Sequence, residues 1–195
     1  VKWVDDNMEM INAIAKDPYT NKQWVDDSVK KNKSFQRLAS ILDITRDDGL
    51  SFVPVQLDGQ CNGSQHWSAI MGDETIAGLT GVLPSDKPQD LYQHIADSTT
   101  EYCKMHKDEI DWCAQFLEFW GEEIDRKVTK RPTMCDAYGL TFYGIQKYLK
   151  IEGHLDWVNR DKAGGAIVEL ARAIKAALDK CLQSPNQGKN WLKSV

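Results

Sequence analysis

The sequence predicts an α+β fold that is mainly helical, with few short strands. Apolar residues recur at three- and four-residue spacing along most of the chain, which is typical of helices packed on a core. Residues 51–58 instead alternate apolar and polar side chains, which predicts a strand. Pro54 removes a backbone donor there, so we expect that strand at a sheet edge. With 195 residues, 42% of them hydrophobic, the chain is long enough to bury such a core.

Four helices are expected in the first half of the chain. Apolar residues at helical spacing define a first helix over 4–15, and the Asp-Pro pair at 17–18 ends it. A second apolar face covers 35–42. Beyond the predicted strand, similar spacing indicates a short helix over 64–71 and a longer one over 88–107.

The second half is expected to be helical almost throughout. The predicted helices cover residues 110–120, 122–137, 143–149 and 160–181. Gly121 and the Tyr-Gly pair at 138–139 separate the first three. Pro132 lies inside the second of them, where it frees a carbonyl and is expected to kink the helix.

Composition excludes several classes of protein. No apolar run approaches the roughly 20 residues of a spanning helix, and the first residues do not resemble a signal peptide, so we expect no membrane contact and a cytoplasmic location. Five cysteines without a C-x-x-C pair argue against a disulfide framework or a zinc knuckle.

Charge is unevenly distributed along the chain. The net charge of −5 argues against a protein that coats nucleic acid by bulk charge. Residues 126–150, however, contain six basic residues and one acidic residue, so this stretch has a local net charge of +5. This stretch is the candidate region for an anionic ligand.

Residues 57–69 place a carboxylate and a glycine directly after the predicted strand. Asp58 next to the Gly59 carbonyl is a sensible half-site for a hard cation such as magnesium, which takes oxygen ligands. Two other interpretations are open. Asp58 could simply cap a turn, and Cys61 with His66 could form the nucleophile and base of a cysteine hydrolase, although nothing predicts that these two side chains face each other.

Residues 126–139 place cations on one face of a predicted helix. Arg126 and Lys130 are four residues apart, with Arg131 alongside, and like charges at this spacing repel each other by a few tenths of a kcal/mol. No carboxylate on that helix face offsets the repulsion, which favours an anionic ligand such as a triphosphate. Tyr138 follows about two turns later and could meet a sugar or a base. The alternative is a solvated basic helix surface.

Together these two segments resemble the bacteriophage-type single-subunit RNA polymerases, a family shared by podoviruses and mitochondria. Residues 57–69 are similar to its motif A, and residues 126–139 are similar to its motif B, Arg-x3-Lys-x7-Tyr-Gly. Shorter similarities occur at 83–92 and 190–194, so the resemblance covers most of the chain in order. It implies a partial right-hand polymerase fold, with a palm-type segment at 1–107 and a fingers-type segment at 108–195.

The resemblance also implies roles for individual residues. Asp58 and Gly59 are expected to hold Mg²⁺, and Lys130 is expected to donate a proton to the leaving pyrophosphate. Tyr138 is expected to favour ribose over deoxyribose. The remaining implied sites are the incoming NTP (Arg126, Lys130, Arg131, Tyr138 and Tyr92) and the template (Gly139, Tyr143 and Gly144).

The function implied by the resemblance is two-metal, template-dependent nucleotidyl transfer from NTPs, transcribing phage genes in the cytoplasm of an infected bacterium. The implied partners are a DNA template, an RNA product and the remainder of the polymerase chain, without an obligate oligomer. The family's second metal-binding aspartate lies in a His-Asp pair, and this sequence contains no such pair. We therefore expect an internal fragment that is inactive alone.

Two alternatives to this function differ in class. A family A DNA polymerase shares the Arg-x3-Lys-x7-Tyr-Gly pattern, but Asp58 is followed by glycine rather than by the Tyr-Ser type of sequence found there. A non-catalytic helical module that binds nucleic acid is the other alternative.

Overall fold

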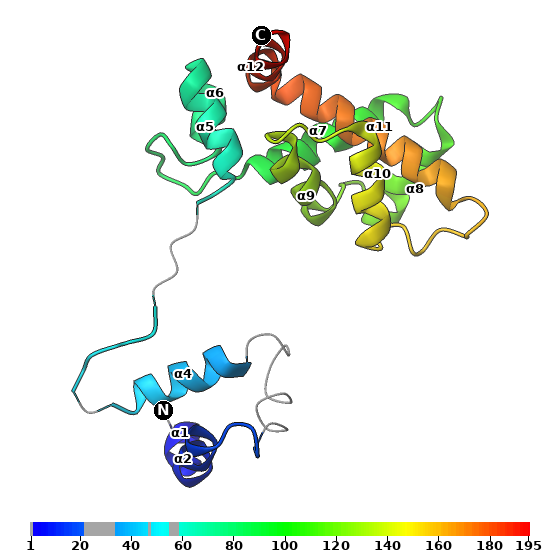
Figure 1. Cartoon of the computed structure of the whole chain (residues 1–195). Coiled ribbons are helices and arrows are strands. Elements are labelled where there is room, and N and C mark those ends of the chain that lie inside the picture. Colours follow the sequence, from blue (N-terminus) through cyan, green and yellow to red (C-terminus); the bar gives the residue numbers. More distant parts are fainter. Residues whose placement is uncertain (1, 22–33, 47, 55–58) are drawn as a thin grey trace. The chain divides into compact units, whose positions relative to one another are not determined.

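The computed structural model describes residues 2–21, 34–46, 48–54 and 59–195, and within these residues it contains helices and no strand (Figure 1). The prediction of a mainly helical chain is confirmed. The predicted strand is wrong for residues 51–54, which have irregular backbone; its other residues, 55–58, lie outside the described part. Alternation alone does not make a strand, because a strand needs a neighbour for its backbone hydrogen bonds.

The chain divides into two compact units, Val1–Asp58 and Gly59–Val195. The described helices of the first unit are α1 (Lys2–Asp6), α2 (Met8–Lys16) and α4 (Ser34–Ile44). Its small core pairs two isoleucines of α2 with two apolar residues of α4: Ile11, Ile14, Leu38 and Ile41. Both helices lie where apolar spacing predicted helix, but the single helix predicted over 4–15 is divided at Asn7 into α1 and α2. The palm-type and fingers-type segments expected at 1–107 and 108–195 stay a prediction.

The second unit begins with a pair of short helices. In α5 (Asn62–Met71), the helix starts after Cys61, whose φ of 63° is left-handed, and ends at Gly72, whose φ of 64° suits a glycine. The next helix, α6 (Glu74–Leu79), was not predicted. It forms because the Asp73 side chain accepts a hydrogen bond from the Ile76 amide at 3.0 Å and so caps the first turn.

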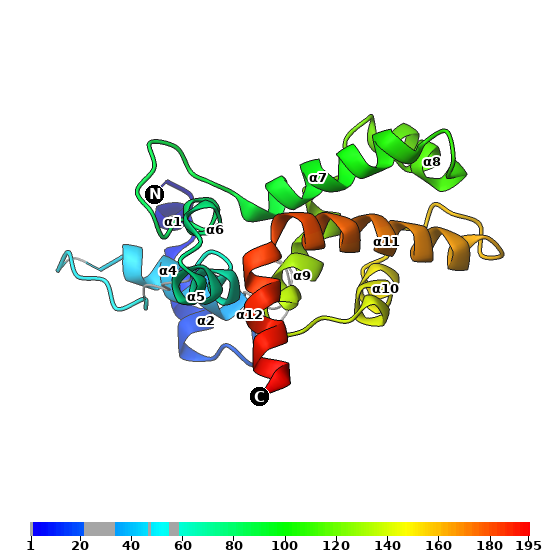
Figure 2. The ribbon, with the colours of Figure 1, turned by 90° about the horizontal axis from the view of Figure 1, so that it is seen from above.

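Two long helices form the centre of the second unit. Helices α7 (Leu91–His106) and α11 (Ala163–Cys181) lie side by side in both views (Figures 1 and 2). Ile95, Leu170 and Ile174 are fully buried in the core that these helices share with their neighbours. The predicted apolar face of α11 is therefore confirmed.

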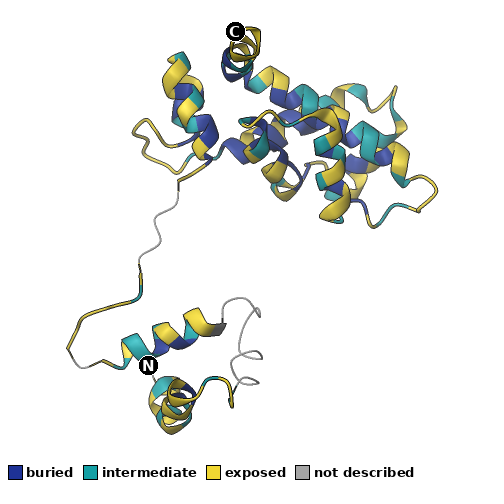
Figure 3. Ribbon diagram, viewed as in Figure 1, coloured by how far each residue is buried: buried dark blue, intermediate teal, exposed yellow. Residues whose placement is uncertain are grey.

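Shorter helices pack around that centre. These are α8 (Asp111–Trp120), α9 (Arg126–Asp136) and α10 (Phe142–Ile151), and their buried residues turn toward α7 and α11 (Figure 3). Helix α9 continues through Pro132, whose ring is buried. The spacing from Arg126 to Lys130 lies before this proline, so both residues stay on the regular part of the helix.

The last helix, α12 (Gln183–Ser194), was not predicted either, because few of its residues are apolar. Pro185 is tolerated in its first turn. It packs against α5 at Gly188, where an added Cβ would lie 2.6 Å from the Trp67 ring. None of the helices in the described part of the chain has the length and apolar character needed to cross a membrane.

Candidate functional site

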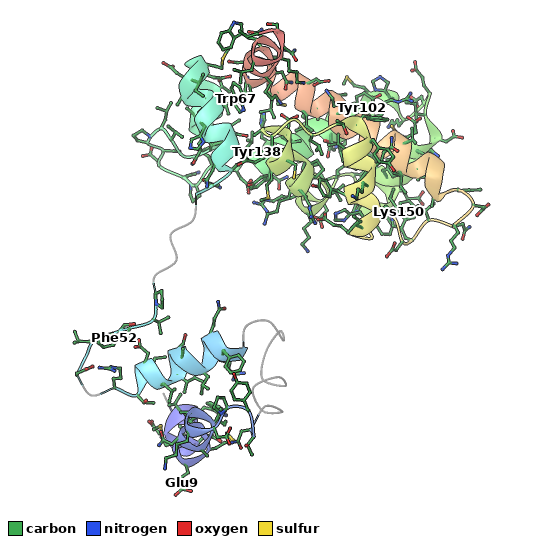
Figure 4. All side chains as sticks on the ribbon, viewed as in Figure 1. Glu9, Phe52, Trp67, Tyr102, Tyr138 and Lys150 are labelled. Carbon is green, nitrogen blue, oxygen red and sulfur yellow. The ribbon has the colours of Figure 1, made fainter. Side chains whose placement is uncertain are left out.

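The two segments singled out in the sequence contact each other. The Trp67 indole on α5 donates a hydrogen bond to the Ala137 carbonyl at 3.1 Å, just beyond α9. A Cβ built on Gly63 would lie 2.4 Å from the Ala137 Cβ and 3.3 Å from the Tyr138 ring. Figure 4 labels Trp67 and Tyr138 on the two sides of this contact. The second unit thus brings together residues about 70 positions apart.

The predicted metal half-site is only partly described. Asp58 lies outside the described residues. Gly59 is exposed, and a side chain at this position would collide with Asn62, whose Oδ1 lies 1.8 Å from an ideal Cβ. Within the described ranges, no three His, Cys, Asp or Glu side chains converge as metal ligands would. The magnesium site at Asp58 and Gly59 therefore stays a prediction.

Cys61 faces the protein interior rather than a catalytic base. Its side chain is buried, and its thiol lies 3.3 Å from the Ser64 hydroxyl. The buried Tyr92 is its other neighbour: burial, and secondarily the Cys61 thiol, raise the pKa of the Tyr92 phenol. His66 is exposed on α5. The thiol is thus paired with Ser64 and Tyr92, which does not favour a cysteine hydrolase.

Arg126 is held by the start of α7. Its Nε lies 2.6 Å from Asp90 Oδ2, and its guanidinium carbon lies 5.0 Å from the centre of the Tyr92 ring. Asp90 also caps α7 by accepting hydrogen bonds from the Tyr92 amide at 2.9 Å and the Gln93 amide at 3.2 Å. One carboxylate therefore fixes the first turns of α7 and α9 together.

These contacts set the acidity of Asp90. Burial alone would raise the pKa of its carboxyl, but hydrogen bonds from Arg126 and from the two backbone amides outweigh burial and lower that pKa. The carboxylate thus stabilises the fold above the ordinary aspartate pKa of about 3.9, and this contribution is lost as the pH falls below that value.

We expect Asp90→Ala to lower the free energy of unfolding of the 195-residue chain by about 0.5–2 kcal/mol at pH 7, the usual cost of losing an N-cap. The difference from wild type should shrink as the pH falls below about 4. Urea denaturation at pH 7 and pH 3 measures both values. Asp97→Ala is the control: Asp97 is an exposed residue of the α7 interior that accepts a hydrogen bond from Gln93. A loss as large as that of Asp90→Ala would contradict the capping role.

Arg131 is held by the end of α10. Its Nη1 lies 2.9 Å from Glu152 Oε1, and its guanidinium stacks over the Tyr148 ring at 4.4 Å. The other Glu152 oxygen lies 3.0 Å from His154 Nε2. The structure therefore corrects one step of the sequence argument, since Asp90 and Glu152, which lie beyond α9, do offset two of its cations.

Lys130 differs from both arginines. It is exposed on α9, and in the described part of the chain no carboxylate pairs with it. Of the three predicted cations, it is therefore the one whose charge is uncompensated by the residues that the structure describes.

The predicted template residues lie after α9. The first of them, Gly139, has a φ of +81° in the turn after α9 and follows Tyr138, a predicted nucleotide residue that is 78% exposed. Tyr143 is 75% exposed near the start of α10. Gly144 donates its amide to the Thr141 hydroxyl, and a Cβ there would lie 2.6 Å from Leu140 Cδ1.

Tyr143, a predicted template residue, lines a groove of about 480 Å³ whose other residues were not predicted as template contacts. The groove lies along α10 and the start of α11 and is lined by Tyr143, Gln146, Lys147, Lys150, Ile151, Gly164 and Ile167. Tyr143, Lys147 and Lys150 are spaced four and three residues apart and share a helix face. This spacing is visible in the sequence and could have added Lys147 and Lys150 to the predicted template residues.

The whole chain, residues 1–195, matches the family model described as DNA-dependent RNA polymerase. The chain belongs to this family. The mitochondrial DNA-directed RNA polymerase of Schizosaccharomyces pombe is 29% identical over 98% of the chain, and that of Mus musculus is 30% identical over 97%. The mitochondrial DNA-directed RNA polymerase 1B of Nicotiana tabacum is 27% identical over 98%. The chain spans 17%, 16% and 20% of the length of these relatives.

Membership in the RNA polymerase family confirms the resemblance drawn from the two motifs. The match is to RNA polymerases, which does not favour the family A DNA polymerase alternative.

Two contacts in this RNA polymerase segment were not predicted from the sequence. Lys189 on α12 pairs with Asp136 at the end of α9, with Nζ to Oδ2 at 2.6 Å, and Trp67 binds the next carbonyl of the chain. Neither contact has a local sequence signal, because both join distant helices.

Proposed function

We propose that this segment binds the incoming nucleotide of a single-subunit, DNA-directed RNA polymerase, and that the full-length enzyme synthesises RNA from NTPs on a DNA template. The contact of Gly63 and Trp67 with Ala137 and Tyr138 carries the proposal. It puts the start of α5, which follows Gly59, beside the end of the helix that bears the cations. A nucleotide bound there reaches both motifs.

The three cations, Arg126, Lys130 and Arg131, make different contributions to triphosphate binding in this proposal. Arg126 uses Nε for Asp90, and Arg131 uses Nη1 for Glu152, so each guanidinium keeps other N–H donors for phosphate oxygens. Lys130 brings an uncompensated ammonium group, which can donate a proton to the departing pyrophosphate. The Tyr92 ring lies under the Arg126 guanidinium, and in this proposal it borders the nucleotide.

The proposed metal is Mg²⁺, held by the Asp58 carboxylate and the Gly59 carbonyl. Both are hard oxygen ligands, so their chemistry fits this ion. When bound, magnesium supplies Lewis-acid stabilisation of the reacting phosphate, and two such ions act in the mechanism that the resemblance implies. One carboxylate does not complete a two-metal site, so we propose that further ligands come from outside this segment and that the segment is inactive alone.

We propose that the template strand runs through the groove beside Tyr143. An exposed tyrosine can stack on a base, and the two lysines can contact its phosphates. Lys150, labelled in Figure 4, and Lys147 are both exposed and have no carboxylate partner among the described residues. Ile151 and Ile167 also line the groove and add apolar surface against which a base can pack.

Replacing both groove lysines by methionine, Lys147→Met with Lys150→Met, should weaken template binding by the full-length polymerase. We expect the slope of log affinity against log salt to fall by about 2, roughly 1 per phosphate contact. Fluorescence anisotropy with a labelled DNA template measures this slope. The pair Lys104→Met with Lys107→Met, at the end of α7, is the matched control; an equal change would mean a general effect of charge.

The function is tested directly with purified protein. The full-length polymerase should synthesise RNA from a DNA template and the four NTPs when Mg²⁺ is present, and the 195-residue chain should not. Synthesis by the isolated chain, with contaminating polymerase excluded, would contradict the proposal that the second metal needs ligands from outside this segment. Binding of template without any synthesis by the full-length protein would instead favour the non-catalytic module.

The resemblance further leads us to propose that the full-length enzyme transcribes phage genes in the cytoplasm of an infected bacterium, as a single chain without an obligate oligomer. The relatives compared above are mitochondrial RNA polymerases by name. Sequencing the surrounding gene tests this proposal: phage genes on both sides would support it, and an organellar targeting sequence would contradict it.

A further inference from the structure

The end of α9 is held by side chains from two other helices. The last carbonyls of an α-helix have no partner within the helix. Here the Lys189 ammonium on α12 donates to the Asp136 carbonyl at 3.0 Å, and the Trp67 indole on α5 donates to the Ala137 carbonyl at 3.1 Å. These are the two carbonyls immediately before Tyr138.

Lys189 and Asp136 form a buried ion pair. The Lys189 Nζ lies 2.6 Å from Asp136 Oδ2, and the two side chains are only 12% and 7% exposed. A charge pair removed from water is stable only when its geometry is good and its other donors are satisfied. Because Lys189 bonds both the carboxylate and the backbone carbonyl of Asp136, the pair fixes the backbone at this point as well as the side chains.

The two holding side chains are themselves in contact through α12. Gly188 precedes Lys189, and a Cβ at that position would lie 2.6 Å from the Trp67 ring and 2.8 Å from Met71 Sδ. Helix α12 therefore rests directly on α5. The end of α9 contacts α12, α12 contacts α5, and α5 contacts the end of α9, so each of the three helices touches the other two.

Tyr138 is the next residue after the two whose carbonyls are bound by Lys189 and Trp67. The residue is 78% exposed, and the hydroxyl-bearing end of its ring rests on Gly63, where an ideal Cβ would lie 3.3 Å from Cζ and 3.4 Å from the phenolic oxygen. Because the rest of the residue is exposed, the position of the phenol depends on this contact with α5 and on the backbone of the two residues before Tyr138. We infer that Lys189 and Trp67 are positioning residues that set the Tyr138 phenol in the nucleotide pocket and thereby the preference for ribose over deoxyribose.

This inference rests on the proposed function, in which Tyr138 senses the sugar of the incoming nucleotide. A purely structural role for Lys189 and Trp67 would lower the stability or the overall rate of the enzyme and leave its sugar preference unchanged. The ratio of kcat/KM for an NTP to that for the matching dNTP separates the two roles, because it compares two substrates on the same folded enzyme.

The experiment measures that ratio for single-nucleotide addition by the full-length polymerase. Tyr138→Phe, which removes the phenolic hydroxyl, should lower the ratio about tenfold, the worth of one good hydrogen bond. Lys189→Met should lower it by a factor of about three to ten, and Lys189→Arg, which keeps the charge and the donors, should restore most of it. Lys193→Met, an exposed lysine of the same helix, is the control and should leave the ratio unchanged.

Trp67→Phe gives a second, independent variant if Lys189→Met does not fold, since it keeps an aromatic ring on α5 and removes the indole N–H donor together with part of the ring. It should also lower the ratio. If Tyr138→Phe lowers the ratio while Lys189→Met and Trp67→Phe keep the wild-type value, the positioning inference is wrong and the proposed function stands. If Tyr138→Phe keeps the wild-type ratio in an enzyme that still makes RNA, the sugar-sensing role of Tyr138 and the inference both fail.

Discussion

Replacing Lys130 by methionine is expected to lower kcat of the full-length polymerase by a factor of about 10² to 10⁴, the usual contribution of a positioned general acid. The KM for NTPs should change much less, because in the proposed site Arg126 and Arg131 still contact the phosphates. The reason lies in the charge balance of α9: both arginines have carboxylate partners, whereas Lys130 is exposed and unpaired among the described residues. Single-turnover nucleotide addition at saturating NTP measures the effect.

Lys127→Met is the matched control for this variant. Lys127 lies on the same helix, is also exposed and has no carboxylate partner in the described part of the chain. Its loss should leave kcat close to the wild-type value. Equal losses in both variants would show that the general positive charge of α9, rather than the Lys130 ammonium, is what the reaction needs.

The largest effect on stability is expected for Ile174→Ala, which should lower the free energy of unfolding by about 2–5 kcal/mol. Ile174 is fully buried on α11, in the core that α11 shares with α7. A loss of this size is a large fraction of the roughly 5–15 kcal/mol that stabilises an ordinary domain. Urea denaturation of the 195-residue chain, followed by tryptophan fluorescence, measures it.

Ile70→Ala on α5 is the control, because it makes the same chemical change on a helix at a side chain that is 71% exposed. Its effect should stay within about 0.5 kcal/mol. If the two variants lost stability equally, α11 would not be the central helix of this unit.

The helices that the sequence predicted well are those with a strong apolar face of their own. Helices α2, α7 and α11 have buried residues at helical spacing, so their pattern is visible locally. Helices α6 and α12 were missed for different reasons. The first is short and depends on its Asp73 cap, and the second is fixed by contacts with α5 and α9 that no local pattern reveals.

The candidate site was likewise predictable only in part: its residue types and spacing were visible in the sequence, but their partners were not. The residue types and spacing in the two motifs pointed to a metal and to a triphosphate, and the family membership confirmed the resemblance that joined them. The partners of those residues were not predictable. Asp90 lies 36 residues from Arg126, Glu152 lies 21 from Arg131, and Lys189 lies 53 from Asp136. A single sequence carries no signal for such pairs, because only the folded arrangement of the helices brings them together.

The contact at Gly63 also limits which side chains positions 63, 137 and 138 can carry. Tyr138 looks like an open position for substitution, since most of the residue faces solvent. The hydroxyl-bearing end of its ring, however, rests on Gly63, where even one added carbon would lie 2.4 Å from the Ala137 Cβ. Variation at 138 is therefore tied to what positions 63 and 137 allow, and the three are best randomised together with small residues at 63.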